Sequence, residues 1–191
     1  MLYSFYISFV HFCDIIVIGD EMEKEIKKRK HPRLDGYDYS SDGAYFITIC
    51  TQNRRCVLSH IVGRGLAPAE TSEVVLTKFG KVAEKQLITL TERFNNLTVE
   101  RYVIMPNHIH AILILNGEAA GASPRPTLMD IVCAYKSLAT KECKKIGFSG
   151  KFFQSSFYEH IIRGKEDLEE IAKYIYENPT KWLYDELYAE E

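Results

Sequence analysis

The sequence predicts an α+β sandwich, in which helices pack on an antiparallel sheet, within a single domain. Strand-like runs of β-branched and aromatic residues alternate with helical patterns, two of these runs are separated by a very short turn, and no internal repeat occurs. With 191 residues, 46% hydrophobic and 26% charged, the chain has the size and composition of one globular domain with a buried core.

The first half of the chain predicts a strand, a loop and a helix. Residues 44–51, AYFITICT, are rich in the aromatic and β-branched residues that favour a strand. Residues 59–72 contain two glycines and a proline and predict a surface loop. From Thr77 onwards the spacing is helical, and one face of this helix would consist of Phe79, Val82, Ala83, Gln86, Leu87, Leu90 and Phe94.

A β-hairpin is predicted in the middle of the chain. Residues 99–105 and 108–115 both read as strands. Between them, Pro106 supplies a fixed φ and Asn107 tolerates turn conformations, so the two strands should be joined by a tight turn.

The last third predicts a loop, two helices and a fourth strand. Residues 116–126 form the loop, and Thr127 is a good N-cap for the helix that follows. Residues 157–162 predict the strand, and the last helix should run from about 166 to 178, ending before Pro179. The first of these helices should bury Leu128, Ile131, Val132, Tyr135 and Leu138.

Charge distribution and cysteine content indicate which partners and which cellular compartment fit the protein. The net charge is −2, but residues 22–64 hold nine basic and five acidic residues (+4), and residues 165–191 hold three basic and nine acidic (−6). The basic end could meet phosphates, or the two ends are simply solvated faces. The five cysteines are odd in number and contain no C-x-x-C pair, which predicts buried free thiols in the cytoplasm.

Residues 2–18 are strongly apolar, but they fit neither a signal peptide nor a membrane span. Basic residues do not precede them, and His11 and Asp14 interrupt them. We expect residues 1–21 to be an extension upstream of the true start at Met22, and residues 22–191 to form the single domain. A short membrane or partner anchor is the alternative; no stable membrane association is expected.

His108 and His110 are the first chemical signal. They stand at i and i+2 of a predicted strand, so both imidazoles should project from the same face. Two imidazoles on one rigid surface can bind a divalent metal. The alternative is a pair of hydrogen-bonded or surface histidines without a ligand.

Tyr174 and Asn178 are the second signal. They stand at i and i+4 of the last predicted helix and therefore share a face, whereas Tyr176 points elsewhere. Beside a metal, a phenol can serve as a nucleophile and an amide oxygen as a third ligand. A single tyrosine on an amphipathic helix is otherwise a core or interface residue.

These segments together resemble the single-tyrosine HUH transposases, in their REP-associated branch. The segment YVIMPNHIHAILIL resembles the motif of two histidines flanking a hydrophobic residue, and YIYENPTKW resembles the nucleophile helix. Two further segments resemble the amino-terminal signature and the approach to the nucleophile helix. In this sequence the four segments occupy residues 102–115, 174–182, 29–54 and 152–175.

The resemblance implies a ferredoxin-like fold with the histidine pair on a central strand. It implies His108 and His110 as metal ligands, Asn178 as third ligand and Tyr174 as nucleophile, with Mg²⁺ or Mn²⁺ as the metal. The implied activity is cleavage and rejoining of single-stranded DNA through a 5′-phosphotyrosine, at hairpin-forming repeats, by a monomer or homodimer. Lys136 and Arg101 are either phosphate contacts of such a site or ordinary surface charges.

Two other functions are compatible with parts of the sequence. A non-catalytic module of the same fold could bind single-stranded nucleic acid through Tyr37, Tyr39 and Tyr45. A metal-dependent hydrolase could use His108 and His110 with water, but it needs a carboxylate ligand, for which Glu159 is a candidate. Only the transposase would form a covalent adduct with DNA.

Overall fold

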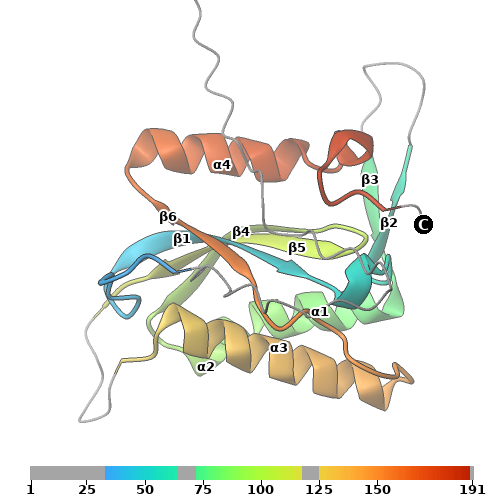
Figure 1. Ribbon diagram of the computed structural model, residues 1–191, viewed down its shortest axis with the longest axis horizontal. Helices are drawn as coiled ribbons and strands as arrows, with labels where there is room; N and C mark the ends of the chain where they lie inside the picture. Colours follow the sequence, from blue (N-terminus) through green and yellow to red (C-terminus); the bar gives the residue numbers. More distant parts are fainter. Residues whose placement is uncertain (1–32, 64–71, 118–124, 190–191) are drawn as a thin grey trace, which may run out of the picture. The chain divides into compact units, whose positions relative to one another are not determined.

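The computed structural model describes residues 33–63, 72–117 and 125–189 (Figure 1). The described elements, in chain order, are β1 (Gly43–Cys50), η1 (Gln52–Arg54), β2 (Ser59–Val62), β3 (Glu73–Leu76), α1 (Lys78–Ile88), α2 (Leu90–Arg93), β4 (Leu97–Ile104), β5 (His108–Leu115), α3 (Leu128–Lys145), β6 (Tyr158–Ile162), α4 (Lys165–Glu177) and η2 (Trp182–Tyr184).

The predicted apolar extension and the basic residues before Arg33 lie outside the described residues, as does most of the loop predicted at 116–126. Among the helices of the described part, none combines the length and apolar character that a bilayer crossing requires.

A four-stranded antiparallel sheet confirms the predicted α+β class. Its order is β4-β5-β1-β6, and the chain passes through it as β1-α1-β4-β5-α3-β6, which is the ferredoxin-like arrangement. Every pair in this sheet is antiparallel. Strand β5 has a neighbour on each side, so the histidine pair lies on a central strand.

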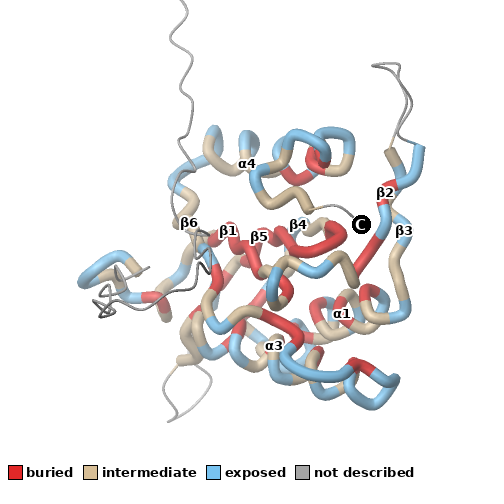
Figure 2. Tube along the Cα trace, turned by 45° about the vertical axis from the view of Figure 1, so that its right-hand side comes forward, coloured by how far each residue is buried: buried red, intermediate tan, exposed pale blue. Residues whose placement is uncertain are grey.

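Helices cover both faces of the sheet (Figure 1). Helices α1, α2 and α3 lie on one side and α4 lies alone on the other. Figure 2 shows buried residues along β1 and β5, between these layers. On β5, Ile109, Ala111 and Leu113 belong to the larger core beneath α1 and α3, while Ile112 packs with Phe46 and Ile175 beneath α4. The same alternation places His108 and His110 on one face, as predicted, and this is the face that α4 covers.

The tight turn between β4 and β5 is confirmed and is fastened to the rest of the sheet. The Met105 amide donates to the His108 carbonyl at 2.9 Å, which closes the turn. The Thr51 amide donates to the Asn107 carbonyl at 2.9 Å, and the Leu58 amide donates to the Pro106 carbonyl at 3.0 Å. The position of His108 is therefore fixed by three separate segments of backbone.

Helices α1 and α3 both start at a threonine cap, and the cap at Thr127 was predicted. The Thr77 hydroxyl accepts from the amides of Phe79 and Gly80. Thr127 and Asp130 form a complete capping box at the start of α3. The residues of α3 that were predicted to be buried are buried, except Leu138, which is half-buried. Its neighbour Ala139 is buried instead.

Three sequence predictions need correction. Residues 59–62 are a strand, β2, paired with β3, and not part of a surface loop. The helix predicted from Thr77 is divided at Thr89 into α1 and α2. Of the four described cysteines, which were predicted to be buried, only Cys143 is; Cys50 and Cys56 are half-buried and Cys133 is exposed.

We expect Gly80→Ala to destabilise the domain. Helix α1 approaches the backbone of Leu58 so closely at Gly80 that a Cβ there would overlap the Leu58 carbonyl oxygen. The overlap should lower the free energy of unfolding by on the order of 2 kcal/mol, although alanine is the better helix former. Urea denaturation measures this change. The exposed neighbour Lys81 is the control, and a Gly80→Ala protein as stable as Lys81→Ala would contradict the close packing.

Candidate active site

His108 is held in a single tautomer by its neighbour. Asn107 uses its side-chain amide to donate to the Leu187 carbonyl at 2.7 Å, so its Oδ1 is the acceptor that faces His108 Nδ1 at 2.8 Å. The proton of the His108 ring therefore sits on Nδ1, and Nε2 keeps its lone pair. His108 is fully buried, and its Nε2 has no hydrogen-bond partner among the described residues.

His110 lies beside His108 and faces the same space. The two ring centroids are 4.4 Å apart. The Nδ1 of His110 forms a hydrogen bond with the Thr48 hydroxyl at 2.9 Å. The Phe46 ring stacks on the imidazole, with 5.1 Å between the ring centroids. These contacts fix the ring and leave Nε2 directed towards Tyr174, whose hydroxyl lies 3.4 Å away.

Burial keeps both imidazoles neutral. It lowers the pKa of His108 to about 3, with a smaller contribution from the positive charge of Arg54. Burial also lowers the pKa of His110 well below its ordinary value, and the adjacent His108 adds to that effect. A neutral imidazole with a free lone pair is the form that binds a metal ion.

Tyr174 brings a phenol to the edge of the histidine pair. Its ring packs edge-on against those of His110 and Phe46, with 5.2 Å and 6.0 Å between the ring centroids. The residue is 41% exposed, whereas Tyr176 on the same helix is 76% exposed. Burial, followed by the negative charges of Asp185 and Glu186, raises the pKa of Tyr174.

The chain after α4 adds a carboxylate that was not predicted at this site. Asp185 follows η2, and its carboxylate accepts from Asn178 Nδ2 at 2.8 Å and from the Leu187 amide at 2.7 Å. Trp182 is fully buried, with its ring 5.8 Å from that of His108. This tryptophan anchors the returning segment against the site.

His108, His110 and Asp185 form a group that can hold a metal ion. Their ligand atoms all lie within 4.8 Å of one another. Two neutral imidazoles and a carboxylate are a suitable donor set for a divalent cation. The predicted third ligand, Asn178, is 2% exposed and contacts this group through Asp185, and its Oδ1 is buried without a hydrogen-bond partner among the described residues. An orphaned imidazole nitrogen and amide oxygen are both polar atoms that a cation would satisfy.

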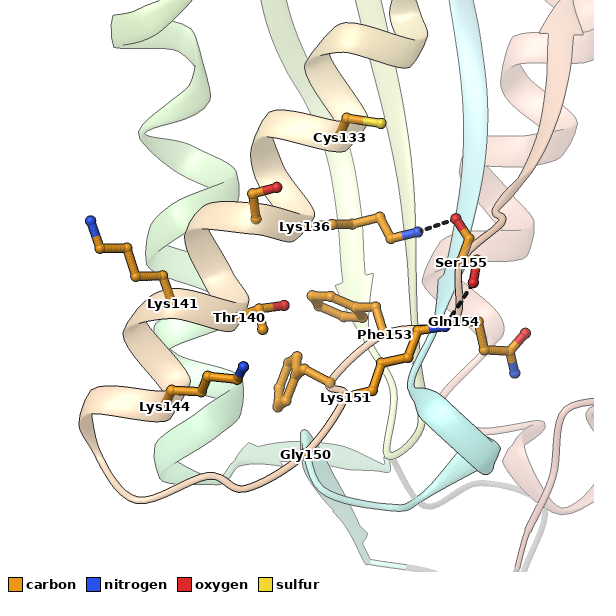
Figure 3. A pocket seen from close by; sticks show the side chains of 12 residues that line it. Cys133, Lys136, Thr140, Lys141, Lys144, Gly150, Lys151, Phe153, Gln154 and Ser155 are labelled. Atoms are coloured by element: carbon orange, nitrogen blue, oxygen red, sulfur yellow. Dashed lines mark hydrogen bonds between the residues drawn. The ribbon is translucent and has the colours of Figure 1, made fainter.

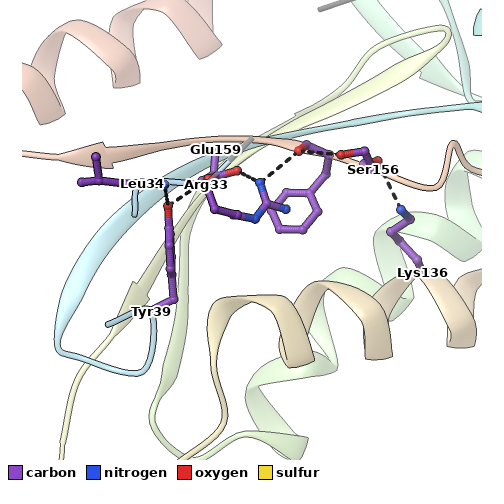
Figure 4. Close-up of polar contacts among 7 residues, drawn as sticks. Arg33, Leu34, Tyr39, Lys136, Ser156 and Glu159 are labelled. Atoms are coloured by element: carbon purple, nitrogen blue, oxygen red, sulfur yellow. Dashed lines mark hydrogen bonds and ion pairs between the residues drawn. The ribbon is translucent and has the colours of Figure 1, made fainter. Parts of the chain in front are cut away.

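Glu159 does not belong to this site. It pairs with Ile47 on β1 and therefore lies on the face of the sheet opposite to the histidines. There it forms an ion pair with Arg33 and accepts from the Tyr39 hydroxyl at 3.0 Å (Figure 4). Lys136 is also on that side, where it donates to a backbone carbonyl. Arg101 is exposed, and it lies opposite Ile112 in the β4–β5 register, on the α4 side of the sheet.

The tyrosines proposed as a base-stacking platform are not available for stacking. Tyr45 is fully buried and Tyr39 is 8% exposed. Tyr37 packs edge-on against Tyr39 at 5.0 Å and is half-buried. The non-catalytic binding module needs these three rings exposed for base stacking, and the structure does not expose them.

Comparison with known proteins gives one consistent likeness. No family model matches the chain. An uncharacterised protein of Haemophilus influenzae is 29% identical over 180 residues, which cover 86% of this chain and 96% of that protein. A second Haemophilus influenzae protein, named "Putative REP-associated tyrosine transposase", is 25% identical over 156 residues, or 78% of this chain and 77% of the relative.

A solved structure shares the fold. The REP-associated tyrosine transposase bound to a REP hairpin superposes with a TM-score of 0.54 at 22% identity, over 78% of this chain and 72% of that one. The resemblance drawn from the four sequence segments is thus confirmed: this chain is similar in sequence and in fold to REP-associated tyrosine transposases.

Proposed function

We propose that the protein is a DNA transposase that cleaves and rejoins single-stranded DNA through a phosphotyrosine on Tyr174. The observation that carries this proposal is the 3.4 Å approach of the Tyr174 hydroxyl to His110 Nε2, at the edge of the group formed by His108, His110 and Asp185. A nucleophile beside a candidate cation site is the arrangement that attack on a phosphodiester requires.

In this reaction the Tyr174 oxygen forms a bond to phosphorus as the bond from phosphorus to the 3′ oxygen breaks. The phenol proton leaves to a base, and the departing 3′ oxygen takes up a proton and becomes a free hydroxyl. The 5′ side of the DNA is then joined to Tyr174 as an ester. A 3′-hydroxyl from another strand can reverse these steps, which rejoins DNA without ATP.

Each of the surrounding residues has a task in this scheme. His108, His110 and Asp185, with Asn178 as the further ligand predicted from sequence, would hold Mg²⁺ or Mn²⁺. A bound divalent ion would offset the charge of the phosphodiester and favour ionisation of the phenol. Asn107 and Thr48 orient the two imidazoles through their Nδ1 atoms.

Single-stranded or hairpin DNA is the proposed substrate, because a structural relative was solved bound to a REP hairpin. The active form would be a monomer or homodimer in the cytoplasm. Tyr174 is half-exposed at the rim of the site, so a DNA strand could reach its side chain.

A metal-dependent hydrolase is the second candidate, because Asp185 is a carboxylate beside the histidine pair, the place for which Glu159 was predicted. In a hydrolase water would attack the phosphate and Tyr174 would only pack against His110. A covalent protein–DNA adduct distinguishes the two functions.

The metal site can be tested by titrating Mn²⁺ calorimetrically into four proteins. The native chain should bind the ion, and the double variant His108→Ala/His110→Ala should not, because both imidazole ligands are gone. Asp185→Asn and Asn178→Ala should each weaken binding by about tenfold or more, since each removes a ligand or its hydrogen-bonded partner.

Circular dichroism must show that all four proteins are folded before their affinities are compared. Equal Mn²⁺ affinity in the native and double-histidine proteins would place the site elsewhere. Full affinity in Asn178→Ala alone would remove Asn178 from the ligand set and leave Asp185.

Tyr174→Phe should abolish cleavage while changing the free energy of unfolding by well under ~1.5 kcal/mol, because only one oxygen is lost. Tyr176→Phe is the matched control: it makes the same chemical change two residues along α4, on a side chain that is 76% exposed. Labelled single-stranded DNA with Mn²⁺, run on a denaturing gel, reports the covalent band, and peptide mapping locates it.

An adduct on Tyr176, or an adduct that survives Tyr174→Phe, would show that the nucleophile is wrong. Strand cleavage by the native protein without any covalent band would favour the hydrolase instead.

A further inference from the structure

Arg54 lies in a turn that is fastened to the histidine pair. The turn follows β1 directly, and the last residue of β1, Cys50, pairs with His108. Thr51, which is fully buried, donates to the Asn107 carbonyl through both its amide and its hydroxyl, at 2.9 and 3.0 Å. The backbone that leads to Arg54 is therefore fixed to the same turn that fixes His108.

The backbone at the end of this turn has a left-handed conformation. Asn53 has a φ of 58° and a ψ of 27°, and Arg54 has a φ of 51°. Asparagine tolerates this region, but an arginine is strained in it, and glycine would adopt it without strain. Strained residues of this kind are concentrated at functional sites, so we expect the Arg54 side chain to have a function that offsets the strain.

The Arg54 side chain faces the candidate metal group. It is half-buried, and its Nη1 donates to the carbonyl of Glu186 at 3.3 Å. Glu186 is the residue after Asp185, whose carboxylate belongs to the group. The positive charge of Arg54 also acts on His108, where it adds to the effect of burial in lowering the imidazole pKa. Arg54 therefore contributes a positive charge to the site.

That charge is unfavourable for a metal ion and favourable for a phosphate. Like charges repel, so a guanidinium that acts on His108 does not help a divalent cation to bind beside it. Burial, and then the negative charges of Asp185 and Glu186, raise the pKa of Tyr174. A phosphodiester that approaches this phenol adds another negative charge near those carboxylates. An arginine offsets the resulting repulsion, and its planar fork of donors fits two phosphate oxygens.

We propose that Arg54 contacts the scissile phosphate and stabilises the negative charge on its non-bridging oxygens while Tyr174 attacks. The inference rests on the proposed function and adds a catalytic residue to it. The Tyr174 oxygen bonds to phosphorus as the bond to the 3′ oxygen breaks, and Arg54 neither gains nor loses a proton, because a guanidinium stays protonated in proteins. An ionised phosphate oxygen is a stronger acceptor than the neutral Glu186 carbonyl, so bound DNA can take over that hydrogen bond.

The neighbouring Arg55 provides a matched control, because its replacement removes the same charge one residue along the chain. Arg55 is exposed and points to the other side of the turn, where its Nη2 donates to the Lys151 carbonyl at 3.0 Å. Its guanidinium also lies 4.8 Å from the centre of the Phe148 ring. Lys151 lines a groove between α3 and residues 150–155, away from the histidine pair (Figure 3).

The test measures the rate of covalent adduct formation on saturating single-stranded DNA with Mn²⁺. Arg54→Gln should react on the order of hundredfold more slowly than the native protein, which is the usual effect of removing one donor to a developing negative charge. Arg54→Lys should be intermediate, because it keeps the charge and loses the fork. Arg55→Gln should react at the native rate.

The outcomes separate this proposal from the proposed function. Equal rates in the native and Arg54→Gln proteins, or equal losses in Arg54→Gln and Arg55→Gln, would overturn the role of Arg54 alone. Absence of an adduct in the native protein would overturn the transposase reaction itself, and the role of Arg54 with it.

Mn²⁺ affinity distinguishes a phosphate contact from a role in positioning the histidine group. Measured calorimetrically without DNA, the affinity of Arg54→Gln should equal or exceed that of the native protein, because the substitution removes a nearby positive charge. A loss of Mn²⁺ affinity as large as the loss of rate would show that Arg54 acts only through the metal ligands, which would overturn the proposal.

Arg54→Gly tests whether the strain serves the reaction. This variant should form the adduct as slowly as Arg54→Gln and yet unfold at a higher urea concentration than the native protein, because glycine adopts the left-handed backbone without strain. An Arg54→Gly protein that unfolds at a lower urea concentration than the native protein would make the arginine a structural residue and would overturn the proposal.

Discussion

The pairing of β1 with β5 is the constraint on which the site depends. In this register Thr48 lies opposite His110 and Cys50 opposite His108, so both imidazoles face α4. Side chains alternate along a strand, and a slip by one residue would turn both imidazoles into the apolar core beneath α1 and α3. That slip is strongly disfavoured, because Ile109 on the same strand is fully buried and would be moved out of the core. The hydrophobic core thus sets the direction of the two imidazoles.

Local signals explain why much of the fold was predictable. The runs at β1 and β5, the turn at Pro106 and the capping box at Thr127 are each specified by a few adjacent residues. The β2–β3 pair was missed because each strand has only four residues, and neither SHIV nor EVVL alternates apolar with polar side chains. Its formation depends on distant contacts: the Ser59 hydroxyl donates to the Ile104 carbonyl at 2.8 Å, and Ile61 packs with Trp182.

In the candidate site, too, the residues that follow a local pattern were predictable and the residue placed by tertiary packing was not. The histidine pair follows from strand periodicity, and Tyr174 with Asn178 follows from helix periodicity. Asp185 lies beyond Pro179, where no regular period continues, and in the sequence it is one acid in an acidic terminal segment. Its place is set by the burial of Trp182 beside His108 and by the bond from Asn107 to Leu187. Such returns of the chain are tertiary packing, which a local pattern does not encode.

The difference in burial between the proposed metal ligands and the proposed nucleophile has a physical reason. His108 and Asn178 each keep a buried polar atom without a partner among the described residues, and leaving such an atom unpaired costs about 1–3 kcal/mol. A bound cation would offset that cost and would hold the proposed ligands in one rigid arrangement. A DNA strand cannot enter a space of that kind, so a nucleophile that acts on DNA has to stand at its rim. Tyr174 does so, because α4 lies over one side of the sheet and leaves the phenol half-exposed while its hydroxyl faces His110.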